Sequence, residues 1–126
     1  SELAQVNLDS ARGRLLDILC NYQAMKGCEL IAVFDAYRVP GHDEEFIDFH
    51  NIHVVFTKTA ETADHYIEKF AHENGKKYNV TVATSDGVEQ VIIRGQGCLL
   101  ISAREFEKEI AAMEEHLREN YLNKTY

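Results

Sequence analysis

The sequence predicts an α/β fold in which strands alternate with helices around a mainly parallel sheet. Two observations support this prediction. Apolar residues recur at helical spacing in three long segments, and short continuous apolar runs lie between these segments. Strands that alternate with helices in this way build a parallel sheet that helices cover on both faces.

The totals of the chain fit one soluble domain over residues 1–126. Hydrophobic residues make up 45% of its 126 residues, which is enough for one packed core. No linker-like tract divides the chain, no apolar run is long enough to cross a bilayer, and the first residues do not resemble a signal peptide. Three scattered cysteines fit a reduced protein better than a disulfide framework. We therefore expect a cytoplasmic protein that does not contact a membrane.

The first two elements are predicted to be a helix and a buried strand. Asp9 or Ser10 can cap a helix that runs to about Lys26, and Gly27 can end it. The segment ELIAVFD follows, and its apolar run Leu30–Phe34 is typical of a strand buried on both faces.

The middle of the chain is predicted to hold a loop, a strand and a helix. The range 37–51 contains Pro-Gly and four acidic residues, so we expect an exposed loop there. The segment IHVVFT reads as the second strand. Thr59 can cap a helix over about residues 60–73, which the segment GKK closes.

The last third is predicted to hold two strands and two helices. NVTVAT is the third strand, and a short helix over 87–94 follows it. A turn at 95–97 leads into the fourth strand, CLLIS. Ser102 and Glu105 have the spacing of a capping box, which starts a final helix to about Asn120.

Four acidic residues fall at or just after predicted strand ends, where α/β sheets place their sites. Asp35 ends the first strand and Asp86 follows the third. Glu61 and Asp64 lie in the first turn of the helix after the second strand, and their spacing puts both carboxylates on one helix face.

Carboxylates gathered from separate elements repel one another unless a divalent cation neutralises them. Mg²⁺ and Mn²⁺ prefer such oxygen ligands, and an ion held there can activate water for an in-line phosphoryl displacement. Each acid taken alone also has a structural interpretation, because acids commonly cap helices and occupy turns.

Four blocks of the sequence resemble the YacP-like branch of the NYN (PIN-like) nucleases: GCELIAVFDAY, NIHVVFTKTAETADHYIEK, VTVATSDGVEQVIIRGQG and ISAREF. The resemblance covers about Leu8 to Glu109. It implies a three-layer α/β/α sandwich and metal-dependent endonucleolytic cleavage of RNA. Some members of the family resemble a ribosome-associated enzyme that cuts messenger RNA in the decoding site.

The resemblance also implies roles for individual residues. Asp64 and Asp86 match the best metal ligands, with Glu61 beside them, so these three are the expected catalytic acids. Asp35 is a weaker match, as a metal ligand or as an acid behind one. Ser85 is expected to orient Asp86 or to touch phosphate.

The net charge of −8 needs an explanation if the substrate is RNA, because proteins that hold RNA by phosphate contacts alone are usually basic. Acids clustered around Mg²⁺ or Mn²⁺ ions would account for part of the charge. Recruitment by the ribosome or another partner that holds the messenger RNA would account for the rest. Arg38 and Lys58 lie in or near the long loop and are candidates for phosphate contacts.

The chain departs from the family pattern at its start. Nothing before Leu8 resembles the opening strand that ends in an Asp-Gly-Tyr-Asn-like motif and supplies a further acid. Its loss should leave exposed strand edges, which favour association between copies of the chain. Two other functions therefore stay open: a catalytically incomplete module that binds RNA or protein, and a phosphate-handling enzyme of another doubly wound family.

Overall fold

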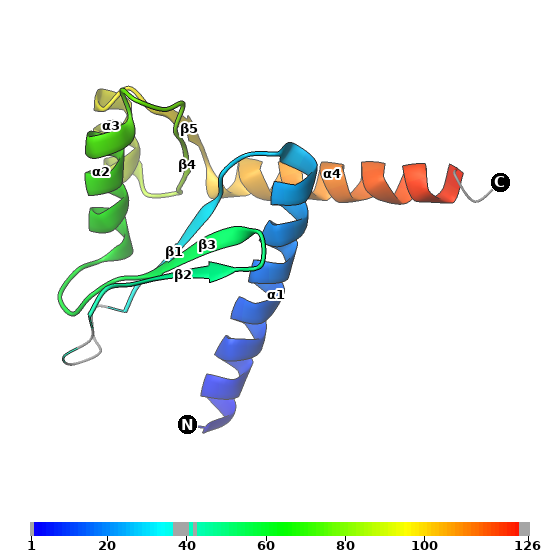
Figure 1. Ribbon diagram of the computed structural model, residues 1–126, viewed down its shortest axis with the longest axis horizontal. Helices are drawn as coiled ribbons and strands as arrows, with labels where there is room; N and C mark the ends of the chain where they lie inside the picture. Colours follow the sequence, from blue (N-terminus) through cyan, green and yellow to red (C-terminus); the bar gives the residue numbers. More distant parts are fainter. Residues whose placement is uncertain (1, 37–40, 42, 124–126) are drawn as a thin grey trace.

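The computed structural model describes residues 2–36, 41 and 43–123, and side chains within 12–36, 41 and 43–120 (Figure 1). Helices and strands alternate over most of the chain, as the sequence predicts. The elements are α1 (Glu2–Lys26), β1 (Ile31–Phe34), β2 (Glu45–Phe49), β3 (Ile52–Phe56), α2 (Ala63–Asn74), β4 (Thr81–Ala83), α3 (Gly87–Gly95), β5 (Leu99–Ile101) and α4 (Ala103–Asn123).

The strands form two small sheets in the part of the chain that is described. One sheet has the order β1-β3-β2, with β1 and β3 parallel and β2 antiparallel to β3. The other pairs β4 with β5 in parallel. Parallel pairing is therefore confirmed, but the prediction of one sheet is wrong for the described residues. No described strand lies along the outer edge of β1 to continue the first sheet towards β4.

The hairpin β2–β3 corrects the prediction of an exposed loop over 37–51. Residues 45–49 form β2, and a two-residue connection at His50 and Asn51 leads into β3. His50 adopts a left-handed backbone with φ of 52°. This turn lacks the Asn-Gly or Asp-Gly pair that usually marks a tight hairpin, so its residues did not indicate it. Residues 37–40 and 42 lie outside the described residues.

Each sheet has its own buried cluster. Leu16 and Leu19 of α1 pack with Ile52 and Val54 of β3. The strand β1 is only half buried, whereas the sequence predicts a strand buried on both faces. The second cluster joins α2, α3 and the β4–β5 sheet and consists of Ala71, Val82, Ile93 and Cys98. Three of the four acids that the sequence singles out adjoin α2 or α3, the helices that cover this second sheet.

The end of α1 agrees with the capping signal of the sequence, and its start does not. Gly27, with φ of 71°, ends α1 as predicted, and its N–H donates to the Gln23 carbonyl at 2.8 Å. The start of α1 at Glu2 shows that Asp9 and Ser10 lie inside the helix and do not cap it. The Ala- and Leu-containing segment before them extends the helical pattern.

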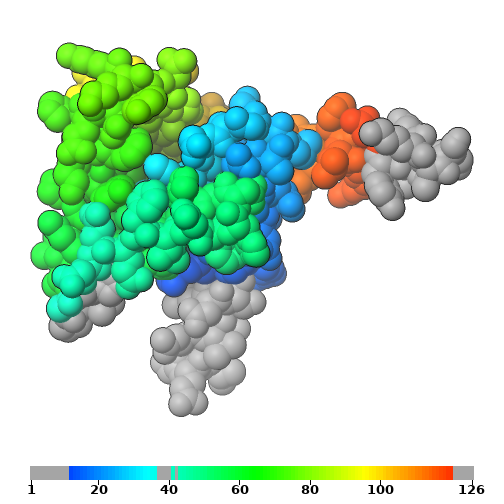
Figure 2. Space-filling model, in the orientation of Figure 1, coloured from blue at the N-terminus to red at the C-terminus, as the bar shows by residue number. Residues whose placement is uncertain are grey.

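The final helix begins as its capping signal predicts and continues past its packed part. The Ser102 hydroxyl accepts from the Glu105 N–H at 3.1 Å. The Tyr22 hydroxyl of α1 donates to a Glu109 carboxylate oxygen at 2.9 Å and ties α4 to α1. The C-terminal part of α4 projects from the body of the molecule (Figure 2). Although α1 and α4 are long, none of the helices in the described part of the chain is apolar enough to cross a membrane.

The imidazole of His53 on β3 lies between two carboxylates. Nδ1 is 2.7 Å from Asp48 on β2, and Nε2 is 3.2 Å from Glu29, which precedes β1. The ring also stacks on Phe46, with centroids 5.2 Å apart. The hydrogen bond to Asp48 raises the pKa of His53 above its usual value of 6.5, and Glu29 adds to the effect.

We expect the β2–β3 hairpin to lose stability as His53 deprotonates. Because the folded pKa is raised, the contribution of the charged ring is fully present below about pH 6.5 and is lost as the pH rises through the folded pKa. Both carboxylates are well exposed, so the effect should be small. An NMR titration of the ring protons should place the His53 pKa above 6.5 and show a decrease in Asp48→Asn. A wild-type pKa at or below 6.5 would contradict the assignment.

Candidate active site

A short loop between β4 and α3 holds Asp86 in a fixed position. One oxygen of its side chain, Oδ1, accepts from the N–H groups of Val88 and Glu89 at 2.9 and 3.1 Å and caps α3. The Asp86 N–H in turn donates to the Thr84 hydroxyl at 3.2 Å. Thr84 therefore has the orienting contact that the sequence suggested for Ser85, whose side chain is exposed.

Glu89 is the most unusual residue of this site, because its side chain is only 1% exposed. It lies one turn before Ile93, and the two residues share the buried face of α3. One carboxylate oxygen, Oε2, accepts from the Thr84 hydroxyl at 3.3 Å. The other oxygen, Oε1, is buried and has no hydrogen-bond partner.

Asp64, in the first turn of α2, brings a second carboxyl group within hydrogen-bonding range of Glu89. Burial, followed by the contact with Asp64, raises the pKa of Glu89 to about 8. Two carboxylates in contact at a buried position are stable only if a proton or a cation lies between them. Asp64 itself is exposed, so solvent reaches the pair from its side.

Glu61 is buried, and it lies outside the helix in whose first turn the sequence predicts it. The helix α2 starts at Ala63 with Thr62 as its cap, so Glu61 precedes the helix and the argument from a shared helix face does not apply to it. The predicted cap at Thr59 is wrong because the backbone turns at Ala60, where φ is 68°.

The carboxyl group of Glu61 has one charged partner. Its Oε2 accepts from the Lys69 ammonium group at 3.1 Å, and this hydrogen bond raises the pKa of Lys69. Its Oε1 is buried without a hydrogen-bond partner. Glu61 is only 4% exposed. Lys69 therefore holds a buried carboxylate, of which one oxygen has no partner.

The remaining candidates lie outside this contact. Asp35 follows β1 and is exposed, and Lys58 follows β3 and is also exposed. Arg38 lies outside the described residues. Among the residues that the structure describes, no group of three or more acidic, histidine or cysteine side chains is close enough to hold a metal ion. The structure thus brings Asp64 together with Glu89, and it does not gather the four predicted acids into one cluster.

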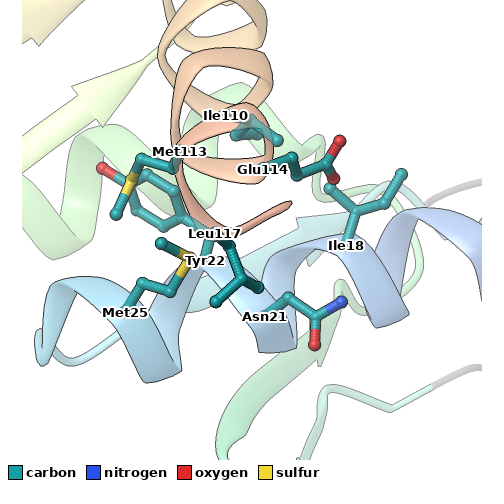
Figure 3. Close-up of a pocket in the computed structure, with 8 residues that line it drawn as sticks. All are labelled: Ile18, Asn21, Tyr22, Met25, Ile110, Met113, Glu114 and Leu117. Carbon is teal, nitrogen blue, oxygen red and sulfur yellow. The ribbon is translucent and has the colours of Figure 1, made fainter. Parts of the chain in front are cut away.

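A pocket of about 70 Å³ lies elsewhere, between α1 and α4. Figure 3 shows the side chains of Tyr22, Met25 and Leu117 turned towards one another from the two helices. The lining is mostly apolar and consists of Ile18, Asn21, Tyr22, Met25, Ile110, Met113, Glu114 and Leu117. It offers no pair of acids for phosphoester chemistry, so the candidate site remains at the β4–α3 loop.

The donor set at that loop fits a small divalent cation. Mg²⁺ is commonly bound by one or two carboxylates, with waters and substrate phosphates as its other ligands. Asp64 and Glu89 supply two carboxyl groups, and the unpartnered Oε1 of Glu89 is an oxygen that a proton or a cation could satisfy. The two hydrogen bonds by which Asp86 caps α3 are both accepted by Oδ1, so neither of them involves its Oδ2.

Comparison with known proteins decides the family. The family model described as YacP-like NYN domain matches residues 1–126. The uncharacterized protein YacP of Bacillus subtilis (strain 168) is 39% identical over 117 residues, which span 92% of this chain and 68% of that protein. The chain belongs to the YacP-like NYN family. NYN domains are nuclease-like.

Solved structures agree with this assignment. A crystal structure of Rae1 (YacP) from Bacillus subtilis superimposes with a TM-score of 0.74 at 39% identity. A point variant of the same protein gives a TM-score of 0.78 at 38% identity. In both comparisons the match covers 92% of this NYN chain and 67% of the other chain.

Sequence reasoning missed three residues of the candidate site: Thr84, Glu89 and Lys69. Glu89 had a detectable signal, since it stands three residues after the capping Asp86 and four before the apolar Ile93. A helix cap followed by an acid on the buried face is unusual, because an acid buried in that position needs a partner. Lys69 had no comparable signal, because its partner Glu61 lies outside the helix.

Proposed function

We propose that this NYN domain is a metal-dependent endoribonuclease. The observation that supports the proposal most directly is the contact between Asp64 and Glu89 at the carboxyl end of β4, in the same turn as Asp86. Acids brought together from α2 and α3 at a strand end are suited to a divalent cation and to phosphodiester chemistry. Membership in a nuclease-like family supports the same function.

In this proposal Asp64 and Asp86 bind Mg²⁺ or Mn²⁺, and Glu61 stands beside them as a third catalytic acid. Such an ion, when bound, lowers the pKa of water and stabilises negative charge on the phosphate. The cap holds Asp86 rigidly, and Lys69 holds Glu61. Asp35 is proposed as a further ligand.

The proposed substrate is messenger RNA, presented by the ribosome or another partner. The net charge of −8 disfavours tight binding of RNA by phosphate contacts alone. Exposed Ser85 and Lys58, together with Arg38, are proposed to contact phosphates of RNA that is already held in place.

The three-layer PIN-like sandwich is part of the same proposal. A further strand along the outer edge of β1 would join the two sheets that the described residues form. A rival function is that of an incomplete module that binds RNA or protein without cutting it. This rival is favoured by the fact that only two acids converge within the described residues.

The decisive experiment is cleavage of an end-labelled messenger RNA by this protein. We expect internal cuts with Mg²⁺ or Mn²⁺, with higher rates when ribosomes present the messenger RNA. Excess EDTA should abolish cutting, and renewed Mn²⁺ should restore it.

A folded full-length protein that cuts nothing, with either metal and with or without ribosomes, would overturn the enzyme proposal. A gel-shift measurement on the same samples would then test the binding module. Turnover of small phosphoesters without cleavage of RNA would instead favour the third function, a phosphate-handling enzyme.

A further inference from the structure

The burial of Glu89 is not explained by the local structure of α3. Asp86 already caps this helix, and Ile93 anchors it in the second cluster. Neither role needs a carboxyl group at position 89. A buried acid beside another acid destabilises a fold, whereas an amide or an apolar side chain of similar size would not.

The surroundings of Glu89 supply only part of what its carboxyl group needs. Thr84 donates to Oε2, and Oε1 has no hydrogen-bond partner although it is fully shielded from water. The charged groups that raise its pKa are Asp64 and, with a smaller effect, Glu68, and both are acidic. Both of these acids lie on α2, so the contact between Glu89 and Asp64 needs either a shared proton or a cation between the two carboxyl groups.

We propose that Glu89 is a divalent-cation ligand and shares one ion with Asp64. The proposal rests on the proposed nuclease function and deepens it by naming a ligand that the sequence did not indicate. Glu89 provides the buried ligand and Asp64 the exposed one, so one side of the ion stays open to water and to phosphate oxygens. The hydrogen bond from Thr84 would help to hold the Glu89 carboxyl group in place as a ligand.

The chain offers a closely matched control for a substitution of Glu89. Glu89 and Glu105 are both the third residue after a helix cap, Asp86 for α3 and Ser102 for α4. Glu105 is exposed, while Glu89 is buried beside Asp64. Glu89→Gln and Glu105→Gln therefore make the same chemical change at equivalent helix positions, and only the first removes a proposed ligand.

The test is Mn²⁺ binding without RNA, measured on the full-length protein by the electron paramagnetic resonance signal of free Mn²⁺. We expect Glu89→Gln to weaken Mn²⁺ binding by at least about tenfold, as loss of a ligating group should. Glu105→Gln should bind Mn²⁺ as the wild type does. Circular dichroism should show that Glu89→Gln remains folded, because the amide relieves the contact between the two acids. Equal Mn²⁺ affinity in wild type and Glu89→Gln would overturn the proposal.

A second measurement on the wild-type protein makes the test independent of any variant. Mn²⁺ at substoichiometric concentration should broaden the amide NMR signals of Asp64, Thr84 and Glu89 before those of α1 and α4. Broadening centred elsewhere would overturn the proposal even if Glu89→Gln failed to fold.

The outcomes separate this inference from the proposed function. Mn²⁺ binding that depends on Glu89, in a protein that cuts no RNA, would support the cation site and reject the nuclease. Metal-dependent RNA cleavage with Mn²⁺ binding unchanged in Glu89→Gln would support the nuclease and reject Glu89 as a ligand.

Discussion

Asp64→Asn is expected to lower the rate of RNA cleavage by at least about 100-fold, which corresponds to loss of roughly 3 kcal/mol of transition-state stabilisation by a bound cation. The fold should be at least as stable as that of the wild type. Asparagine removes the negative charge that faces Glu89, and its amide group can donate to the unpartnered Oε1. Lost activity in a protein that is not destabilised would identify Asp64 as a functional acid.

The cleavage assay and thermal unfolding should be run together on three variants. Asp86→Asn should lose activity as well, since asparagine retains most of the cap of α3 but not the charge. Asp17→Asn, the same change at an exposed position of α1, should leave both rate and stability unchanged. Cleavage by Asp64→Asn at the rate of Asp17→Asn would show that Asp64 holds no catalytic ion.

Gly75→Ala should lower the free energy of unfolding by about 2–3 kcal/mol, at the upper end of the usual cost of overpacking. Gly75 caps α2 where that helix meets the end of α3 and the start of β5. A Cβ there would lie 2.7 Å from the carbonyl oxygens of Ala71 and Gln96 and 3.1 Å from the Cys98 sulfur. Two of these atoms belong to the backbone, so the clash cannot be relieved by rotating a side chain.

Thermal unfolding of Gly75→Ala and of a control variant, Gly13→Ala, should separate the effect of crowding from the general effect of glycine on helix stability. Gly75→Ala is expected to lower the Tm by roughly 6–12 °C for a chain of this size. At Gly13, within α1, a Cβ would meet nothing within 4 Å. Gly13→Ala should therefore raise the free energy of unfolding by about 0.5–1 kcal/mol. A Tm for Gly75→Ala equal to that of the wild type would show that α2 and the α3–β5 turn are less tightly packed.

Both predictions concern the unit built from α2, α3, β4 and β5, where the proposed site lies. Glu61 and Glu89 each bury one oxygen without a hydrogen-bond partner, so the site itself contributes little to stability. The apolar cluster beneath it, with Ala71 and Ile93 fully buried, has to supply the stability instead. Tight packing at Gly75 and unfavourable burial of acids thus occur in the same unit of the fold.

Local signals in the sequence were sufficient for the alternation of elements, for β3 and α3, and for the cap at Ser102. Each depends on residues close together in the chain, such as an apolar run or a hydroxyl three residues before a glutamate. The family was also readable from the sequence, because its motifs are contiguous. The hairpin strand β2 was not, since it forms by pairing with β3 and its own turn residues give no strong signal.

The partners of the buried acids were decided only by the tertiary structure. Apolar residues surround α3 on several sides, with Val88 and Val91 exposed and Ile93 buried, so hydrophobicity alone does not show which face points inward. Packing against α2 and the β4–β5 sheet selects the face that holds Glu89, and it places Asp64 from another helix against it. A contact between residues 25 positions apart depends on how two helices dock, and the spacing of residues along one segment does not encode it.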